Sequence, residues 1–150
     1  MDAPRCARPF LAAALCLVLA VNPAPGLAQT TDAPPRLSLA LNTVSVPEAG
    51  GCRLTFVIRN DLGAAIEQLV AEAVLFDTKG RVATMTLFDF GHLPEARPRV
   101  RQFDLAGMGC DSIGGVLVNG IGTCEGADLA PGACLDGLRL SSDTDIEVTG

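Results

Sequence analysis

The sequence contains no tryptophan, no tyrosine and a single histidine among its 150 residues. Trp and Tyr supply the rigid aromatic anchors of many tight interfaces and sugar sites, so both kinds of site are disfavoured. Positive charge is also scarce, because 11 Lys and Arg stand against 17 Asp and Glu, which gives a net charge of −6. An acidic chain is repelled by phosphate backbones and anionic lipids, so neither nucleic acid nor a membrane surface is expected as the main partner.

Long hydrophobic runs are missing as well. The apolar segment FLAAALCLVLAV (residues 10–21) is too short for a membrane-spanning helix. Two arginines precede it, and NPAPGLA follows it with small residues at Gly26 and Ala28. This pattern predicts a secretory signal peptide over residues 1–28. We therefore expect an exported protein, periplasmic or secreted, with no membrane attachment once the signal is cleaved.

The rest of the chain has the length of one domain. Residues 29–35 are expected to form a short flexible linker, and residues 36–140 a single folded domain. The last ten residues, SSDTDIEVTG (141–150), are expected to form an acidic mobile tail.

Four of the six cysteines lie beyond the predicted signal peptide, at Cys52, Cys110, Cys124 and Cys134. There is no Cys-x-x-Cys pair, and an oxidising compartment disfavours thiolate zinc sites, so two disulfides are expected. Three pairings are possible. We favour Cys124–Cys134, which closes a short loop, and Cys52–Cys110, which joins one strand to a later segment.

Alternation of apolar and polar residues is the dominant pattern, and a period of two indicates β-strands. In CRLTFVIRN, the residues from Cys52 to Ile58 at even positions are expected to face the core, with Arg53, Thr55, Val57 and Arg59 on the other face. In EQLVAEAVLFD, Leu75 is expected inward and Val74 outward. Six segments separated by turn formers have this character: RLSLALN, CRLTFVIRN, EQLVAEAVLFD, RVATMTLFDF, RVRQFDL and GGVLVNGI. They predict an all-β, antiparallel sandwich.

The segment VLFDTKGRV could hold a catalytic acid or form the corner of a hairpin. Asp77 and Gly80 are the residues that a short hairpin turn requires, and an Asp carboxylate accepts backbone N–H groups two residues further on. We expect a structural corner.

The stretch from VIRNDLGAAIEQLV through VLFDTKGRV to RVRQFDL resembles FxLYD-type and related immunoglobulin-like domains of exported bacterial proteins. The four cysteines, with FDLAGMGCDSIGGVLVN, are similar to those of small exported proteobacterial proteins. The resemblance extends from Leu37 to about Leu138. It implies an immunoglobulin-like sandwich of about seven strands and brings no catalytic residues with it.

Candidate chemistry is sparse. His92 could form a triad with Asp89 and Ser112, but there is no Gly-x-Ser-x-Gly motif, so we expect no enzyme and no cofactor. Arg97, Arg99 and Arg101 recur at every second residue and could bind an acidic partner, or could protect a sheet edge from aggregation.

These observations predict a non-enzymatic exported module that binds or supports another protein of the cell envelope. The alternative is a periplasmic copper-handling protein that uses Cys110, Met108, Met85 and His92 as soft ligands. Free thiols would separate the two, since two disulfides would leave no thiolate for the metal.

Overall fold

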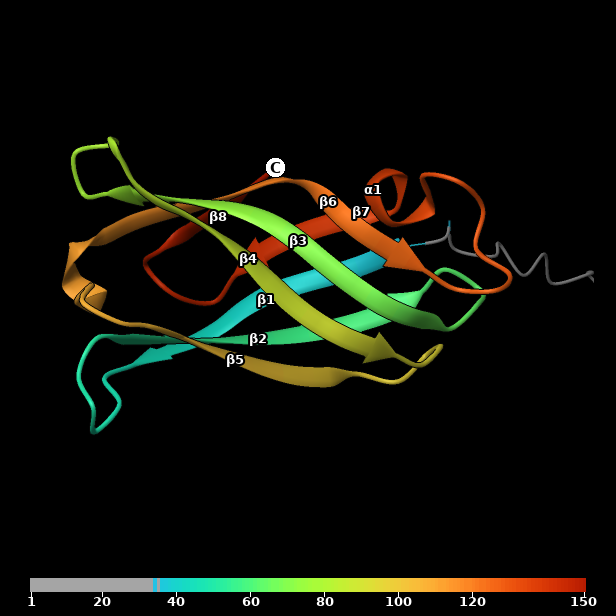
Figure 1. Cartoon of the computed structure of the whole chain (residues 1–150), viewed down its shortest axis with the longest axis horizontal. Helices are drawn as coiled ribbons and strands as arrows, with labels where there is room; N and C mark the ends of the chain where they lie inside the picture. Colours follow the sequence, from blue (N-terminus) through green and yellow to red (C-terminus); the bar gives the residue numbers. More distant parts are fainter. Residues whose placement is uncertain (1–33, 35) are drawn as a thin grey trace, which may run out of the picture. The chain divides into compact units, whose positions relative to one another are not determined.

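The computed structural model describes residues 34 and 36–150. The predicted signal peptide and all but residue 34 of the predicted linker lie outside the described residues. The described chain is a sandwich of two four-stranded sheets (Figure 1), which confirms the predicted all-β fold. Within this part of the chain, no helix has the length and apolar character needed to cross a bilayer.

One sheet, called sheet A, has the strand order β5-β2-β1-β7, and the other, sheet B, has the order β4-β3-β6-β8. Two short helices, η1 and α1, lie in the connections that lead to β6 and β7. The elements are β1 (Arg36–Ser45), β2 (Cys52–Asp61), β3 (Ile66–Asp77), β4 (Val82–Leu93), β5 (Arg99–Leu105), η1 (Cys110–Ser112), β6 (Ile113–Glu125), α1 (Ala133–Asp136), β7 (Leu138–Ser142) and β8 (Glu147–Thr149).

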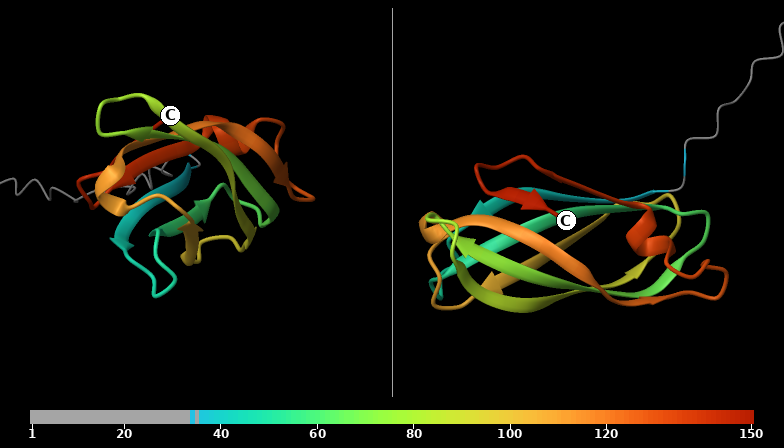
Figure 2. Two further views of the ribbon diagram at one scale, coloured as in Figure 1. Left: turned by 60° about the vertical axis from the view of Figure 1, so that its left-hand side comes forward. Right: turned by 90° about the horizontal axis from the view of Figure 1, so that it is seen from above.

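The structure has eight strands rather than about seven, and two of its strand pairs are parallel rather than antiparallel: β1 with β7, and β6 with β8. Consecutive strands β4 and β5 stand at the ends of different sheets, and so do β7 and β8. The connection from β4 to β5 therefore passes from sheet B to sheet A on one side of the sandwich, and the connection from β7 to β8 passes from sheet A to sheet B on the other (Figure 2).

Alternating burial confirms the predicted strand registers. Cys52, Leu54, Phe56 and Ile58 are fully buried, while Arg53, Val57 and Arg59 retain access to solvent. The prediction is less accurate on the outward face of β3. Val74 is only 6% exposed there, because it is in register between Met85 of β4 and Leu117 of β6, whose large side chains flank it.

Four phenylalanines form an aromatic cluster between the sheets, on the side where β4 and β5 lie. The ring centroids of Phe88 and Phe103 are 4.5 Å apart, and Phe56 meets the edge of Phe90 at 5.8 Å. Phe56 belongs to β2, in sheet A, and Phe88 and Phe90 to β4, in sheet B. The cluster therefore joins the two layers in a chain that has no larger aromatic residue.

Asn60 is the one fully buried polar side chain at the end of β2. Its amide nitrogen donates to the carbonyls of Ala64 and Leu93, at 2.8 and 3.0 Å, and its amide oxygen accepts from the backbone N–H of Leu62. All of its polar capacity apart from one lone pair is used. Asn60 thereby fixes the connection between β2 and β3 to the end of β4.

Residues 141–150, expected as a mobile tail, are folded instead. They include the end of β7 and the whole of β8, and Ile146 and Val148 are buried in the core. The backbone N–H of Asp143 donates to Leu41, and the Ser142 hydroxyl accepts from Thr144 N–H. The two serines end β7, residues 143–146 form the turn between the two sheets, and Glu147–Thr149 form β8.

Truncation of Phe56 tests the core. We expect Phe56→Ala to lower the free energy of unfolding by about 3–5 kcal/mol, because it removes a buried ring and leaves a cavity. The matched change Phe76→Ala, at a half-buried position on the outer face of β3, should cost about 1–2 kcal/mol. Urea denaturation followed by circular dichroism measures both; equal costs would contradict the assigned core.

Candidate functional site

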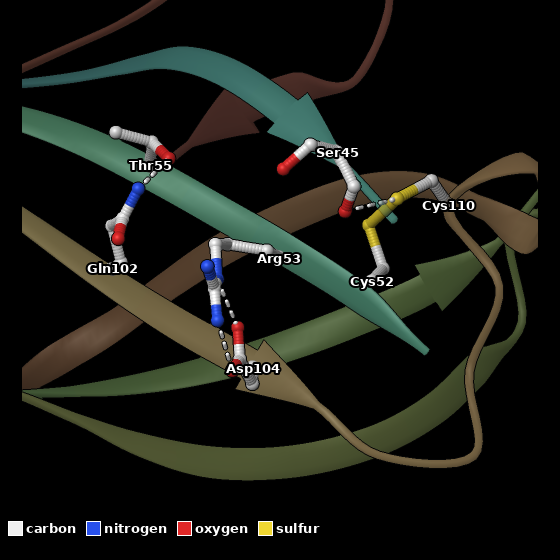
Figure 3. Close-up of polar contacts among 7 residues, drawn as sticks. All are labelled: Ser45, Cys52, Arg53, Thr55, Gln102, Asp104 and Cys110. Carbon is white, nitrogen blue, oxygen red and sulfur yellow. Dashed lines mark hydrogen bonds and ion pairs between the residues drawn. A yellow bond between two sulfur atoms is a disulfide. The ribbon is translucent and has the colours of Figure 1, made fainter. Parts of the chain in front are cut away.

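Both predicted disulfides are present. Cys52 pairs with Cys110, with Cα atoms 4.8 Å apart, and Cys124 pairs with Cys134, at 6.3 Å. The first ties β2 of sheet A to η1, just before β6 of sheet B (Figure 3); the second ties the end of β6 to α1, just before β7 of sheet A. Cys110 Sγ also lies 3.4 Å from the Ser45 carbonyl oxygen, a contact without a proton to share.

The residues of the copper hypothesis are not brought together. Cys110 is in a disulfide and offers no thiolate. Met85 and Met108 line the same shallow groove, but His92 lies seven positions along β4 from Met85, roughly 23 Å away. Among the described residues, no group of three or more His, Cys, Asp or Glu side chains is placed to hold a metal ion.

The triad candidates are also separated. Ser112 precedes β6 at the end where Ile113 pairs with Asp77, whereas His92 is at the opposite end, where Leu93 pairs with Ile66. These ends are roughly 35 Å apart along β3. The Ser112 hydroxyl donates to Gly109 O at 2.6 Å, and Asp89 accepts from Gln68 and from Gly91 N–H. The Ser112 hydroxyl and the Asp89 carboxylate therefore form hydrogen bonds with groups near them in the structure.

Asp77 forms the hairpin corner that its sequence predicts. Gly80 N–H donates to Asp77 O, and Gly80 has a φ of 75°, which favours glycine. Asp77 Oδ1 accepts from the backbone N–H groups of Lys79 and Arg81, and Oδ2 accepts from the Arg81 guanidinium. The backbone and side-chain hydrogen bonds from Arg81 lower the pKa of Asp77.

The arginine row does not form an open charged strip. Arg99, Arg101 and Phe103 share the face of β5 that turns toward sheet B, where the Phe103 ring joins the aromatic cluster. Arg101 is half-buried, and its guanidinium donates to the carbonyls of Phe90, at 2.8 Å, and His92, at 3.3 Å. Arg97 remains exposed in the connection before β5. Arg101 is therefore engaged with β4.

Complementary cross-strand pairs cover the outer face of sheet A between β2 and β5 (Figure 3). Arg53 forms a bidentate ion pair with Asp104, at 2.6 and 2.7 Å, and Gln102 donates to the Thr55 hydroxyl. The Arg53 hydrogen bond lowers the pKa of Asp104, and the same bond raises the pKa of Arg53. Polar groups on this face are already satisfied by one another.

The outer face of sheet B, in contrast, exposes apolar side chains. Three of its apolar residues are more than half exposed on β4, and others lie beside them in register on β3 and β6. Met85, Val74 and Leu117 form one continuous row across three strands. We call this surface the β4 patch; its members are Val82, Met85 and Leu87 on β4, Val74 and Phe76 on β3, and Leu117 on β6.

The free edge of β4 adds to this surface. β4 ends sheet B, and its segment VATMTLF (Val82–Phe88) contains no charged residue and no proline. Terminal strands are usually protected by such residues, as β5 is by its arginines and the preceding Pro98. A run of seven uncharged residues that includes Val82, two threonines and Phe88 is the signal in the sequence from which this surface could be found.

Comparisons of the chain with protein-family models, with curated proteins and with solved structures found no match. The FxLYD-like assignment therefore stays a prediction.

The two disulfides should differ in their contribution to stability. Loop-entropy arguments predict a loss of about 4 kcal/mol for Cys52→Ser with Cys110→Ser, and about 3 kcal/mol for Cys124→Ser with Cys134→Ser, because the first closes the longer loop. Chemical denaturation of the two double variants measures this order. Peptide mapping of the native protein should find both bridges and no free thiol; a bridge from Cys52 to Cys124 would contradict the structure.

The hairpin corner predicts a titration. NMR should give Asp77 a pKa below the ordinary aspartate value, and Arg81→Ala should raise it only part of the way, because the Arg81 backbone N–H remains a donor. Since the folded-state pKa is lowered, the stabilisation by Asp77 is present above its unfolded pKa and is lost as the pH falls through the folded value. An unchanged pKa in Arg81→Ala would show that the guanidinium contributes nothing.

Proposed function

We propose that this protein is a non-enzymatic exported module that binds another protein of the cell envelope through the β4 patch. One observation carries the proposal: a cluster of apolar residues on the outer face of sheet B, with Met85 64% and Leu87 63% exposed, whereas the outer face of sheet A between β2 and β5 carries an ion pair and a hydrogen-bonded pair beside the single exposed Val100. Contiguous exposed apolar surface on a small exported domain is typical of an interaction site.

Export is part of the proposal. Two disulfides are typical of proteins that fold in an oxidising compartment, which agrees with a signal peptide over residues 1–28 and a periplasmic or secreted location. In such a compartment the four cysteines of the two disulfides stabilise the fold. Residues 36–150 present a surface on paired strands, and within them Ser112 and Asp89 bond to groups other than His92, which favours binding over catalysis.

A photo-crosslinking amino acid at Leu117 tests the patch in cells. Leu117 is half-buried at the centre of the patch, and Val57 is a matched half-buried position on the outer face of sheet A. We expect position 117, and not position 57, to crosslink one reproducible envelope protein. The same product should disappear when Met85 and Leu87 are both changed to Lys in a variant with a native circular dichroism spectrum.

Equal crosslinking from both positions, or a product that survives the double change, would refute the β4 patch as the binding surface.

A further inference from the structure

Met85 carries the most accessible oxidisable side chain of residues 36–150. The sequence has no Trp or Tyr, and the four cysteines in this part of the chain are all in disulfides, so no thiol there competes for an oxidant. Two methionines lie in the same range: Met85 is 64% exposed, whereas Met108 is half-buried and packs against the core. An exposed thioether meets an oxidant in solvent more readily than a half-buried one, so a peroxide should react with Met85 first.

We propose that Met85 is an oxidation site through which hydrogen peroxide switches off binding by the β4 patch. The thioether sulfur attacks one peroxide oxygen and the O–O bond breaks; the transferred oxygen gives its proton to the other, which leaves as water. The sulfur is oxidised by two electrons to the sulfoxide, and the peroxide is reduced. A sulfoxide can be reduced again to the thioether, so the change is reversible. The inference rests on the proposed function, because it concerns regulation of the same surface.

Met85 lies where a change of polarity affects the whole patch. It is opposite Val74 of β3 in register, and Val74 is opposite Leu117 of β6, so Met85 is the exposed end of the apolar row. Leu87, two positions further along β4, is 63% exposed and faces the same way. The side chains of these three neighbours carry no hydrogen-bond donor. A sulfoxide oxygen at Met85 would therefore take its hydrogen bonds from water.

Oxidation of Met85 should act on binding rather than on folding. In the free protein the sulfoxide is exposed, and water satisfies it. A partner that covers the β4 patch removes this water, and a polar group buried without a hydrogen-bond partner costs free energy. Met108 provides the contrast, because its oxidation would place a polar group against the core and lower stability.

Mass spectrometry of the purified protein after brief treatment with hydrogen peroxide measures the order of oxidation. Trypsin separates the two methionines, because Arg99 and Arg101 lie between them. We expect the Met85 peptide to gain one oxygen atom several-fold faster than the Met108 peptide. The melting temperature should keep its native value while only Met85 is oxidised. Equal rates at the two methionines, or faster oxidation of Met108, would contradict the assigned site.

The crosslink from position 117 measures the effect on binding. Purified protein with the photo-crosslinking amino acid is oxidised, freed of peroxide and mixed with an envelope extract, so that the partner itself is not oxidised. We expect the product found in cells to decrease several-fold, because burial of the methionine side chain no longer contributes to the affinity.

Two substitutions at the same position are the controls. Met85→Leu keeps an apolar side chain that cannot be oxidised, so its crosslink should survive the peroxide treatment. Met85→Gln places an uncharged polar group in the patch and should lower the crosslink without any peroxide. Circular dichroism confirms that both variants are folded.

A wild-type crosslink that survives complete oxidation of Met85, or an equal loss in wild type and in Met85→Leu, would overturn the switch and leave the β4 patch as the binding surface. Absence of a crosslink from position 117 in the untreated protein would instead refute the proposed function, and the switch with it, whatever the order of oxidation. Failure of the switch and failure of the binding surface are thus distinguished by the untreated sample.

Discussion

The sandwich depends on how Arg101 closes the side where its two sheets end without a ladder between them. β4 and β5 share no strand pairing, and the guanidinium of Arg101 bridges them by donating to two β4 carbonyls. Hydrogen bonds from a charged donor are stronger than neutral ones. Arg101 stands opposite Phe56 in register, so the bridge lies next to the aromatic cluster.

On the other side, the chain itself makes the closure. β7 pairs with β1 in sheet A, and after a turn held by Ser142 and Thr144 the chain enters sheet B as β8. The disulfides hold the two ends of the sandwich, since each ties a strand to the helical turn that precedes a strand of the opposite sheet. Arg101, the β7–β8 connection and the two disulfides thus hold together a core whose only large aromatic residue is phenylalanine. The outer faces of sheets A and B take no part in this and differ from each other.

Local patterns predicted much of this fold. Period two identified the buried faces of β1, β2 and β3, the cysteine count and spacing indicated both disulfides, and Asp77 with Gly80 indicated a turn. What the sequence did not reveal depends on residues distant in the chain. Val74 is buried because Met85 and Leu117 flank it, and Arg101 is engaged because β4 passes beside β5. Residues 147–149 are too few to show periodicity, so the sequence predicts a tail there, and it is the pairing with β6 that makes them a strand.

Of the four terminal strands, β4 and β5 lie on the same side of the sandwich and differ in what they expose. β5 carries arginines on the face that turns toward sheet B, and Gln102 and Asp104 on its outer face bond to β2, which leaves Val100 as its exposed apolar residue. β4 has neither protection, yet the chain around it is acidic, with a net charge of −6. Like charge keeps copies apart in most orientations. A partner that meets the uncharged segment of β4 avoids this repulsion, whereas an acidic surface that meets the rest of the molecule does not. In the proposed function this contrast would make binding by the β4 patch selective, because the charges around it disfavour other arrangements.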